Sequence, residues 1–572
     1  MDYKSIILNQ LNIACESLGT QAGVIEVPPN PEMGDVAFPC FGLAKALRKA
    51  PPLIAKDVAT AIEQNPTVEF SNTVQKVVVI GGYVNFFIKK DALVSGVINE
   101  IETKGDDYGK SDIGNNKTVL VEFSSPNIAK PFHVGHLVST ALGSSIERIY
   151  SHLGYDTVKI NHIGDWGTQF GKLISAYKRW GDRSVIEQDP INELLKIYVQ
   201  FHKEAELHPE LEDEARHYFK LLEEGDSEIT QLWQFFVKAS LTEFNRMYDL
   251  LGISFDSYAG ESFYTDKMPE IVDILREKNL LEESEGAQVV RFEDDNMPPC
   301  IILKSDGTTI YATRDIAAAV YRKRHYDFYK NIYVVGTPQT LHFKQVFSVI
   351  DKMGFDWADN CIHVDFGYVR FPDKSMSTRH GDVILLEDLL KMSIAKTKEI
   401  ILESSTSKEL DDIDSVAEKI GVGAIIFAFL KNSRERDIIF TWDDILDFEG
   451  ESGPYVQYAY ARGKSILRRA EDNNDCDETS DVYMPMTEEF ELAKLLNDYE
   501  SVVLEAANKN QPCIITRYTL QVAASFNKFY NTCNIMKSVG QTRKMRLKLT
   551  QAMCTVIKSA LNLIGVDVVE KM

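Results

Sequence analysis

Residues 118–154 constrain the fold most, because they predict a strand, a loop and a helix in immediate succession. Residues 118–123, TVLVEF, are almost entirely β-branched or apolar, which predicts a strand buried on both faces. Two prolines interrupt residues 124–131, so that segment continues neither a strand nor a helix. From His133 apolar residues recur at helical spacing as far as Leu153, and a glycine follows as a stop signal. This succession is typical of an α/β fold.

The first turn of the predicted helix carries two imidazoles. His133 and His136 are three residues apart and therefore share a face, and Lys130 lies just upstream. The free N–H groups and the dipole of a helix N-terminus attract anions. Gly135 lets a flat ligand approach the backbone closely. The pattern predicts a triphosphate site, although the four-residue motif alone fits a helix start with two surface histidines equally well.

Length and composition set the outer bounds. A chain of 572 residues exceeds what one core supports and predicts about three domains. No apolar run reaches the ~18–20 residues needed to span a bilayer, and MDYKSIILNQLN lacks the features of a secretory signal. We therefore expect a soluble, cytoplasmic protein without membrane contact. The eight cysteines show no metal-ligand spacing, which predicts buried free thiols and neither zinc nor another resident metal.

The net charge of the whole chain and the charge of its C-terminal stretch favour different partners. The formal charge of −23 argues against a nucleic-acid partner. Residues 501–572, however, hold ten Lys and Arg against three Asp and Glu, a net charge of +7, so the rest carries −30. Screening limits an electrostatic field to roughly 8–10 Å, so a basic module on an acidic body can still bind a polyanion locally. A solubilising face is the alternative, but such faces usually mix both signs.

Residues 117–400 alternate strand and helix signals, as in a doubly wound parallel sheet. The next strand is predicted at 158–162, and two strand-like runs lie within 288–303. Residues 187–250 are long, charged and helical in pattern, which predicts an inserted helical subdomain. Neither G-x-G-x-x-G after a strand nor G-x-x-x-x-G-K-[ST] occurs, so the dinucleotide fold and the P-loop are excluded. From about Asp411 the strand signals stop.

EFSSPNIAKPFHVGH followed by NHIGDWGTQFG resembles the arginyl-tRNA synthetases, class I enzymes whose HIGH signature stands here at residues 133–136. The resemblance spans the whole chain and is strongest at 121–171 and 305–345. It implies a multidomain α/β plus all-α fold. The implied units are an N-terminal additional domain (1–110), a Rossmann-like catalytic domain (111–400) with an insertion at about 187–250, and a helical anticodon-binding domain (401–572).

The implied activity is ATP-dependent attachment of L-arginine to its tRNA through an arginyl-adenylate, with release of AMP and pyrophosphate. Mg²⁺ would accompany ATP, and the terminal 2′-hydroxyl would be the acceptor. The chain is expected to act as a monomer. By the resemblance, the catalytic residues are His133, His136, Lys130 and Arg379, and the ATP-binding residues are His133, Gly135, His136, Val369, Met376 and Ser377.

A substrate guanidinium requires a carboxylate, whose two oxygens match its fork of donors. Asp315 lies one turn into a predicted helix, on the same face as Tyr311, where an acid alone can also serve only as a partner for the helix dipole. In the family, the corresponding position contacts arginine. The arginine-binding positions carried over by the resemblance are Glu122, Ser125, Pro126, Asn127, His136, Tyr311, Asp315 and Gln339.

Residues 374–381, KSMSTRHG, correspond to the mobile KMSK loop of the family but depart from its pattern. Ser375 and Thr378 occupy the two lysine positions. Family members with such a loop carry a lysine ahead of the HIGH sequence, and Lys130 is that lysine here. Arg379 and His380 are its possible helpers.

The resemblance also implies contacts with tRNA. Tyr83 would stack on an unpaired base and Asn85 would hydrogen-bond it, whereas a packed hairpin is the simpler interpretation. Aromatic residues at helical spacing are likewise more often core than stacking platforms. The resemblance also implies contacts by Tyr455, Tyr458 and Arg462, and the basic C-terminal stretch predicts contacts by Arg543, Lys544 and Arg546.

Two other functions stay open at this point. A class I synthetase for another amino acid would keep the histidine helix but lose the Tyr311, Asp315 and Gln339 group. A catalytically inactive tRNA-binding relative would lose the histidines. All of these residues are present in the chain, which favours the arginine enzyme.

Overall fold

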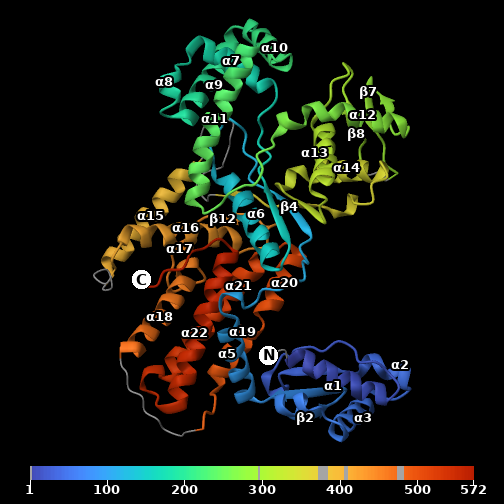
Figure 1. The fold of residues 1–572 in the computed structure, drawn as a ribbon, viewed down its shortest axis with the longest axis vertical. Helices are drawn as coiled ribbons and strands as arrows, with labels where there is room; N and C mark the ends of the chain where they lie inside the picture. Colours follow the sequence, from blue (N-terminus) through green and yellow to red (C-terminus); the bar gives the residue numbers. More distant parts are fainter. Residues whose placement is uncertain (1–2, 294–296, 371–383, 405–409, 473–481) are drawn as a thin grey trace.

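Figure 1 shows an elongated molecule, with a helical group at one end, a small α/β unit at the other and a parallel sheet between them. A long helical region packs below this sheet and beside the small unit. The computed structural model describes residues 3–293, 297–370, 384–404, 410–472 and 482–572.

The N-terminal unit is an antiparallel sheet of order β1-β3-β2 packed against helices. β2 (Val74–Ile80) and β3 (Tyr83–Ile88) form the hairpin that the sequence predicts around two glycines. At the turn of this hairpin, Gly81 has a φ of +59°, which glycine adopts more easily than other residues do. The other elements are α1 (Tyr3–Ser17), β1 (Val36–Pro39), α2 (Ala44–Leu47), α3 (Pro51–Gln64) and α4 (Val68–Thr73).

The central sheet is parallel, with the order β10-β9-β4-β5. β4 (Thr118–Glu122) lies between β5 (Asp156–Ile160) and β9 (Lys330–Val334), and β10 (Cys361–Val364) pairs with β9. The strand predicted at 158–162 thus begins and ends two residues earlier. β4 is buried almost throughout, as its apolar run predicts. α6 (Val134–His152) follows β4, so its N-terminus lies at the carboxyl edge of the sheet.

Helices form the first part of the connection between β5 and β9. The predicted helical segment at about 187–250 is confirmed as helical, and α7 packs against it from the preceding residues. These helices form the group at the top of Figure 1. They are α7 (Thr168–Trp180), α8 (Arg183–Ile186), α9 (Pro190–Leu207), α10 (Glu210–Glu223) and α11 (Ser227–Leu250).

The two strand-like runs within 288–303 do not join the parallel sheet. They form β7 (Ala287–Val290) and β8 (Cys300–Leu303), which with β6 (Glu282–Ser284) make a separate antiparallel sheet. The adjoining helices are α12 (Met268–Glu277), α13 (Tyr311–Tyr326) and α14 (Thr340–Lys352). α13 precedes β9 and α14 follows it, so both helices begin at the carboxyl edge of the parallel sheet, as α6 does.

The C-terminal part is helical, but the prediction that strands stop at about Asp411 is wrong for one short element. β12 (Ile438–Ile439) pairs in parallel with β11 (Val369–Arg370). Two residues are too few to show any periodicity in the sequence. The helices are α15 (Leu386–Glu403), α16 (Ile413–Leu430), α17 (Trp442–Ile445), α18 (Gly453–Asp472), α19 (Thr487–Asn497), α20 (Tyr499–Lys509), α21 (Cys513–Cys533) and α22 (Gly540–Leu563).

α5 (Lys90–Lys104) fastens the N-terminal unit to this helical region by packing against α19 and α22. Lys494 pairs with Asp35 at 3.1 Å, and both side chains are less than one-fifth exposed. Lys548 on α22 pairs with Glu102 on α5 at 2.6 Å.

The structure describes seven of the eight cysteines, and all seven are free and buried, as predicted. Within the described residues, no helix combines the length and the apolar character needed to cross a membrane.

Candidate active site

The loop after β4 has a strained backbone that its surroundings hold in place. Ser124, Ser125 and Ala129 have φ values of +71°, +45° and +59°, a region that residues other than glycine seldom adopt. The Ser124 hydroxyl hydrogen-bonds the Tyr248 hydroxyl at 2.8 Å, and the Ala129 N–H donates to the Ser240 Oγ at 3.1 Å. Both partners lie on α11, so the helical insertion shapes this loop.

On the other side, the loop lies directly against the chain that follows β5. The Gly164 N–H donates to the Pro126 carbonyl at 3.1 Å, and the Ile128 N–H donates back to the Gly164 carbonyl at 3.1 Å. A Cβ at Gly164 would come within 2.1 Å of the Asn127 Oδ1. Glycine is therefore required there for the close approach that fixes Asn127.

The two imidazoles at the start of α6 form a capping box. His133 is the N-cap, and its Nδ1 accepts a hydrogen bond from the Gly135 N–H at 3.1 Å. The His136 Nδ1 accepts one from the His133 N–H at 3.1 Å, and the ring centroids are 3.8 Å apart. Since Nδ1 is an acceptor in both rings, each neutral imidazole carries its proton on Nε2. The pair thus presents two Nε2–H donors.

Burial and charge keep both imidazoles neutral. Burial, together with the neighbouring His133 and Lys130, lowers the pKa of His136 to about 3. Burial, followed by the charge of Lys130, also lowers the pKa of His133. Lys130 itself is exposed. At neutral pH, the ammonium of Lys130 therefore supplies positive charge while the imidazoles supply hydrogen bonds.

Glu122, at the carboxyl end of β4, has a buried ion pair. Its Oε2 lies 2.5 Å from the Nη2 of Arg322, and the two side chains are 8% and 0% exposed. The Arg322 guanidinium lies 5.8 Å from the Tyr264 ring centroid and 5.5 Å from that of Tyr333. The Nε and Nη1 atoms of Arg322 have no hydrogen-bond partner. Glu122 and Arg322 therefore form a buried ion pair at the carboxyl end of β4.

Asp315 lies one turn into α13, where its Oδ2 is 2.5 Å from the Nε2 of His342 on α14. Both side chains are about one-quarter exposed, so the Asp315 carboxylate is accessible to a ligand. Tyr311 begins α13 and is 69% exposed, and Gln339, just before α14, is also exposed. The starts of α13 and α14 therefore present a carboxylate, a phenol and an amide.

A second acid adjoins Asp315. The Glu261 Oε2 lies 3.3 Å from the Arg314 Nη1, and both side chains are less than one-fifth exposed. Burial raises the pKa of Glu261 to about 7; Arg314 opposes that rise, while Asp315 and Asp165 add to it. Glu261 is thus the ion-pair partner of Arg314 and is affected by the charges of two other acids.

Of the remaining residues predicted to bind ATP or to act in catalysis, the structure describes one. Val369 is buried in β11. Met376, Ser377 and Arg379 lie outside the described residues, as do Ser375, Thr378 and His380. The described residues contain no group of three or more His, Cys, Asp or Glu that could hold a metal ion.

The N-terminal tRNA candidates differ in exposure. Tyr83 is partly exposed, with its ring edge-on to Phe41 at a centroid distance of 5.2 Å. Asn85 is 3% exposed, and its Nδ2 donates to the Val78 carbonyl across the hairpin at 3.4 Å. Tyr83 is accessible to a base, whereas the Asn85 side chain lies inside the unit. The packed-hairpin interpretation therefore describes Asn85 better.

On α18 the aromatic residues face a neighbouring helix. The Arg462 guanidinium lies 4.6 Å from the Tyr458 ring centroid and donates to the Asn527 Oδ1 at 2.6 Å. The Asn527 Nδ2 donates in turn to the Tyr455 hydroxyl at 3.0 Å. Tyr458 remains 36% exposed. These residues form an ordered polar cluster with one accessible ring.

The basic residues of α22 divide by exposure. Arg546 is 8% exposed, with its Nε 3.1 Å from the buried Glu489 Oε1 and its Nη1 2.7 Å from the Ser538 Oγ. This internal ion pair explains why an arginine lies on the apolar face of the helix, and the prediction of an RNA contact for Arg546 does not fit the structure. Lys544 is exposed and Arg543 is partly exposed.

Arg322 and His342 have partners that local sequence patterns do not reveal. Arg322 lies three residues after Ala319 and ten after Ala312, on the apolar face of α13, which is an unusual place for a charge. A charged residue on an apolar helix face is therefore the one feature of the sequence that could have indicated this buried ion pair. His342 offered no comparable signal, because its partner, Asp315, lies on a different helix.

Comparison with known families agrees with this geometry along the chain. The model described as "tRNA synthetases class I (R), catalytic domain" matches residues 97–442. The "Arginyl tRNA synthetase N terminal domain" model matches residues 1–88, and the "DALR anticodon binding domain" model matches residues 456–572.

Curated proteins and solved structures give the same result. The chain is 53% identical to arginine–tRNA ligases of Clostridium botulinum (strain 657 / Type Ba4) and Clostridium perfringens, with 100% of each chain covered. The arginyl-tRNA synthetase of Thermus thermophilus has a TM-score of 0.82 at 25% identity, covering 100% of both chains. That of Plasmodium falciparum has a TM-score of 0.80 at 26% identity, covering 100% of this chain and 98% of the other. The chain belongs to the arginyl-tRNA synthetase family.

Proposed function

We propose that this chain attaches L-arginine to its tRNA at the carboxyl edge of the parallel sheet. In the first step, the arginine carboxylate attacks the α-phosphate of ATP, which forms arginyl-adenylate and releases pyrophosphate. In the second step, the 2′-hydroxyl of the terminal ribose attacks the activated carbonyl, and AMP leaves. The observation that carries the proposal is that α6, α13 and α14 all begin at this edge.

The start of α6 is proposed to bind ATP. The Nε2–H groups of His133 and His136 would donate to phosphate or ribose oxygens, and Gly135 would admit the nucleotide close to the backbone. Lys130 would stabilise the charge that develops on the departing pyrophosphate. ATP is the substrate, accompanied by Mg²⁺. Val369, Met376, Ser377 and Arg379 complete the proposed site for ATP.

The arginine is proposed to lie between β4 and the starts of α13 and α14. The accessible carboxylate of Asp315 would accept the guanidinium, with Tyr311 and Gln339 beside it. Glu122 would attract the α-amino group. A carboxylate left unpaired by a neutral side chain is costly, which explains the rejection of other amino acids at binding. The loop would complete the pocket with Ser125, Pro126, Asn127 and His136.

The tRNA is proposed to contact both ends of the chain. Tyr83 in the N-terminal unit and Tyr458, Arg543 and Lys544 in the helical region are accessible. Tyr455 and Arg462 would act by holding Tyr458.

We also propose that the chain works as a monomer in the cytoplasm and that α16 and α17 connect the catalytic and anticodon-binding parts.

Replacing Asp315 by alanine tests the assignment of the arginine site. The variant should lose arginine activation almost completely while binding ATP nearly as well as the unchanged enzyme, because the substrate guanidinium loses its partner and the groups proposed to bind ATP are unchanged. The measurement is ATP–pyrophosphate exchange, with and without tRNA, together with ATP binding. Asp351→Ala on the exposed end of α14 is the control. An exchange rate within about threefold of the unchanged enzyme would rule out this site.

A further inference from the structure

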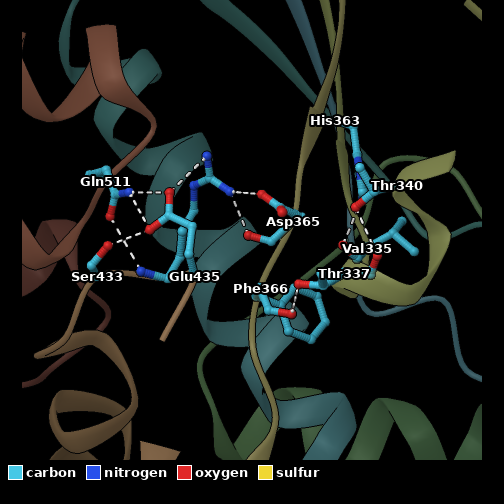
Figure 2. Close-up of polar contacts among 10 residues, drawn as sticks. Val335, Thr337, Thr340, His363, Asp365, Phe366, Ser433, Glu435 and Gln511 are labelled. Carbon is cyan, nitrogen blue, oxygen red and sulfur yellow. Dashed lines mark hydrogen bonds and ion pairs between the residues drawn. The ribbon is translucent and has the colours of Figure 1, made fainter. Parts of the chain in front are cut away.

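The segment that follows β10 is attached to the turn carrying Gln339. The Thr337 N–H and hydroxyl both donate to the Phe366 carbonyl, at 3.1 and 2.8 Å (Figure 2). Thr337 lies two residues before Gln339, in the same short turn. The Thr340 hydroxyl closes the turn onto the Thr337 carbonyl at 2.8 Å. The position of Phe366 therefore sets the position of the turn.

On its other side, the same segment is held by Arg434. The Arg434 Nη1 donates to the Asp365 carbonyl at 2.5 Å and also forms an ion pair with the Asp365 carboxylate. The Gly367 N–H donates to the Arg434 carbonyl at 2.8 Å. Arg434 thus contacts the residues on both sides of Phe366.

The attachment continues along the backbone. The Tyr368 N–H donates to the Asp437 Oδ1 at 3.0 Å, and the Ile438 N–H donates to the Tyr368 carbonyl at 2.8 Å. A Cβ at Gly367 would lie 2.7 Å from the Arg436 carbonyl carbon and oxygen. The two segments are in direct backbone contact, with no space for a side chain between them.

The Arg434 segment is itself fixed to the helical region. The Gln511 Nε2 donates to both carboxylate oxygens of Glu435, at 2.8 and 3.0 Å, and the Arg434 N–H donates to the Gln511 Oε1 at 3.4 Å. The Arg434 Nη2 lies 3.2 Å from Glu435. Figure 2 shows Ser433, Glu435 and Gln511 on one side of Asp365 and Thr337 on the other. The contacts form a chain from the start of α21 to the turn before α14.

We propose that Arg434 is a positioning residue for arginine recognition, acting through Phe366 and Thr337 on the turn that carries Gln339. Its Nη1 bonds the carbonyl and the carboxylate of Asp365 while its Nη2 lies 3.2 Å from Glu435, which a fixed planar fork of donors does well and a lysine does only in part. This inference rests on the proposed arginine site.

Direct contact between Arg434 and RNA is the alternative suggested by the charged run 434–437. The Arg434 side chain is 17% exposed and turned towards Asp365, whereas Arg436 is exposed. The two arginines lie in one segment, so Arg436 provides a matched control for the loss of one charge.

The test is steady-state aminoacylation by full-length Arg434→Met, Arg434→Lys and Arg436→Met variants, with arginine varied at saturating ATP and tRNA. Arg434→Met should raise the arginine KM by about tenfold or more, because a charge-assisted contact that fixes the turn is lost. The ATP KM should change by less than about twofold. Arg434→Lys should recover part of the loss, and Arg436→Met should leave the arginine KM unchanged.

Each other outcome overturns the proposal in a recognisable way. A rise in only the tRNA KM of Arg434→Met would make Arg434 an RNA contact. Equal changes in all three KM values, or a lower melting temperature alone, would make its role purely structural. If Arg434→Met does not fold, Thr337→Val decides the question, because it removes one bond to Phe366 at an exposed position and should raise the arginine KM severalfold. An unchanged arginine KM in Thr337→Val would then overturn the proposal.

Asp315→Asn, measured in parallel, separates this proposal from the proposed arginine site. If Asp315→Asn leaves the arginine KM unchanged, the site itself is wrongly placed. If Asp315→Asn raises it and Arg434→Met does not, only the positioning role fails.

Discussion

The neutral state of His136 has a consequence for acid stability. Burial, together with His133 and Lys130, lowers its pKa to about 3, so the unfolded chain takes up a proton near pH 6.5 that the folded chain does not accept until the pH is far lower. Stability is therefore lost as the pH falls from 6.5 towards 3, by at most about 1.4 kcal/mol per pH unit from this group.

His136→Gln should remove this part of the acid sensitivity. Glutamine at the third helical position can still accept the His133 N–H, so the capping box survives while the titrating group is lost. Urea unfolding of both proteins at pH 7.5 and 5.5 measures the effect. The variant should lose less stability between the two pH values, and an equal loss would show that other groups determine the acid response.

Lys130→Ala should lower kcat for arginine activation by roughly 10²–10³, the usual effect of removing one transition-state donor. The arginine KM should change little, because Lys130 faces the phosphates in the proposed site. Pre-steady-state adenylate formation measures this step directly. Lys117→Ala, which removes a lysine whose Nζ lies 4.5 Å from the Tyr329 ring centroid, is the control. A nearly normal rate for Lys130→Ala would show that Arg379 or His380, and not Lys130, stabilises the charge on the departing pyrophosphate.

At the residue scale, the sequence predicted the groups that lie close together along the chain. His133, Gly135 and His136 fall within one helical turn, so local periodicity places them correctly. The contacts between Glu122 and Arg322, and between Asp315 and His342, join residues on different elements. Nothing in the local pattern specifies such pairs, because they depend on how the helices pack on the sheet.

At the scale of the elements, α13 carries a fully buried charge, Arg322. Arg322→Met should lower stability by about 3–5 kcal/mol, because Glu122 would remain buried without a partner. For a catalytic domain of this size, the melting temperature should fall by several degrees. Calorimetry measures the shift. The double variant Glu122→Gln with Arg322→Met should recover part of it, whereas Arg324→Met, which breaks an exposed pair, should have little effect.

The elements that the sequence predicted well are those with enough residues to show a period. β4 and α6 were placed within one residue of their ends, and the hairpin β2–β3 was equally clear. β11 and β12 contain two residues each, so their pairing arises from long-range backbone contacts alone. The strands β7 and β8 were found, but their sheet was not, because strand pairing is invisible in a single segment.

At the scale of the whole molecule, the basic helical region should determine how tRNA binding depends on salt. Arg543→Gln with Lys544→Gln should weaken binding and reduce the slope of log K against log salt by up to about two units. Filter binding or fluorescence titration between 50 and 300 mM salt measures the slope. Lys548→Gln on the same helix is the control, since its ammonium already pairs with Glu102. An unchanged slope would place the tRNA elsewhere.

The docking of α5 onto α19 and α22 links distant parts of the sequence, and this affects how the chain is made. The ribosome completes α5 at Lys104, but α19 begins only at Thr487. At about 5–20 residues per second, the apolar face of α5 waits roughly 20–80 s for its partners. The N-terminal unit can fold early around its own sheet, but the leucine, valine and isoleucine side chains of α5 remain uncovered until synthesis is nearly finished. During translation, the apolar face of α5 is therefore exposed for most of the time in which the rest of the chain is made.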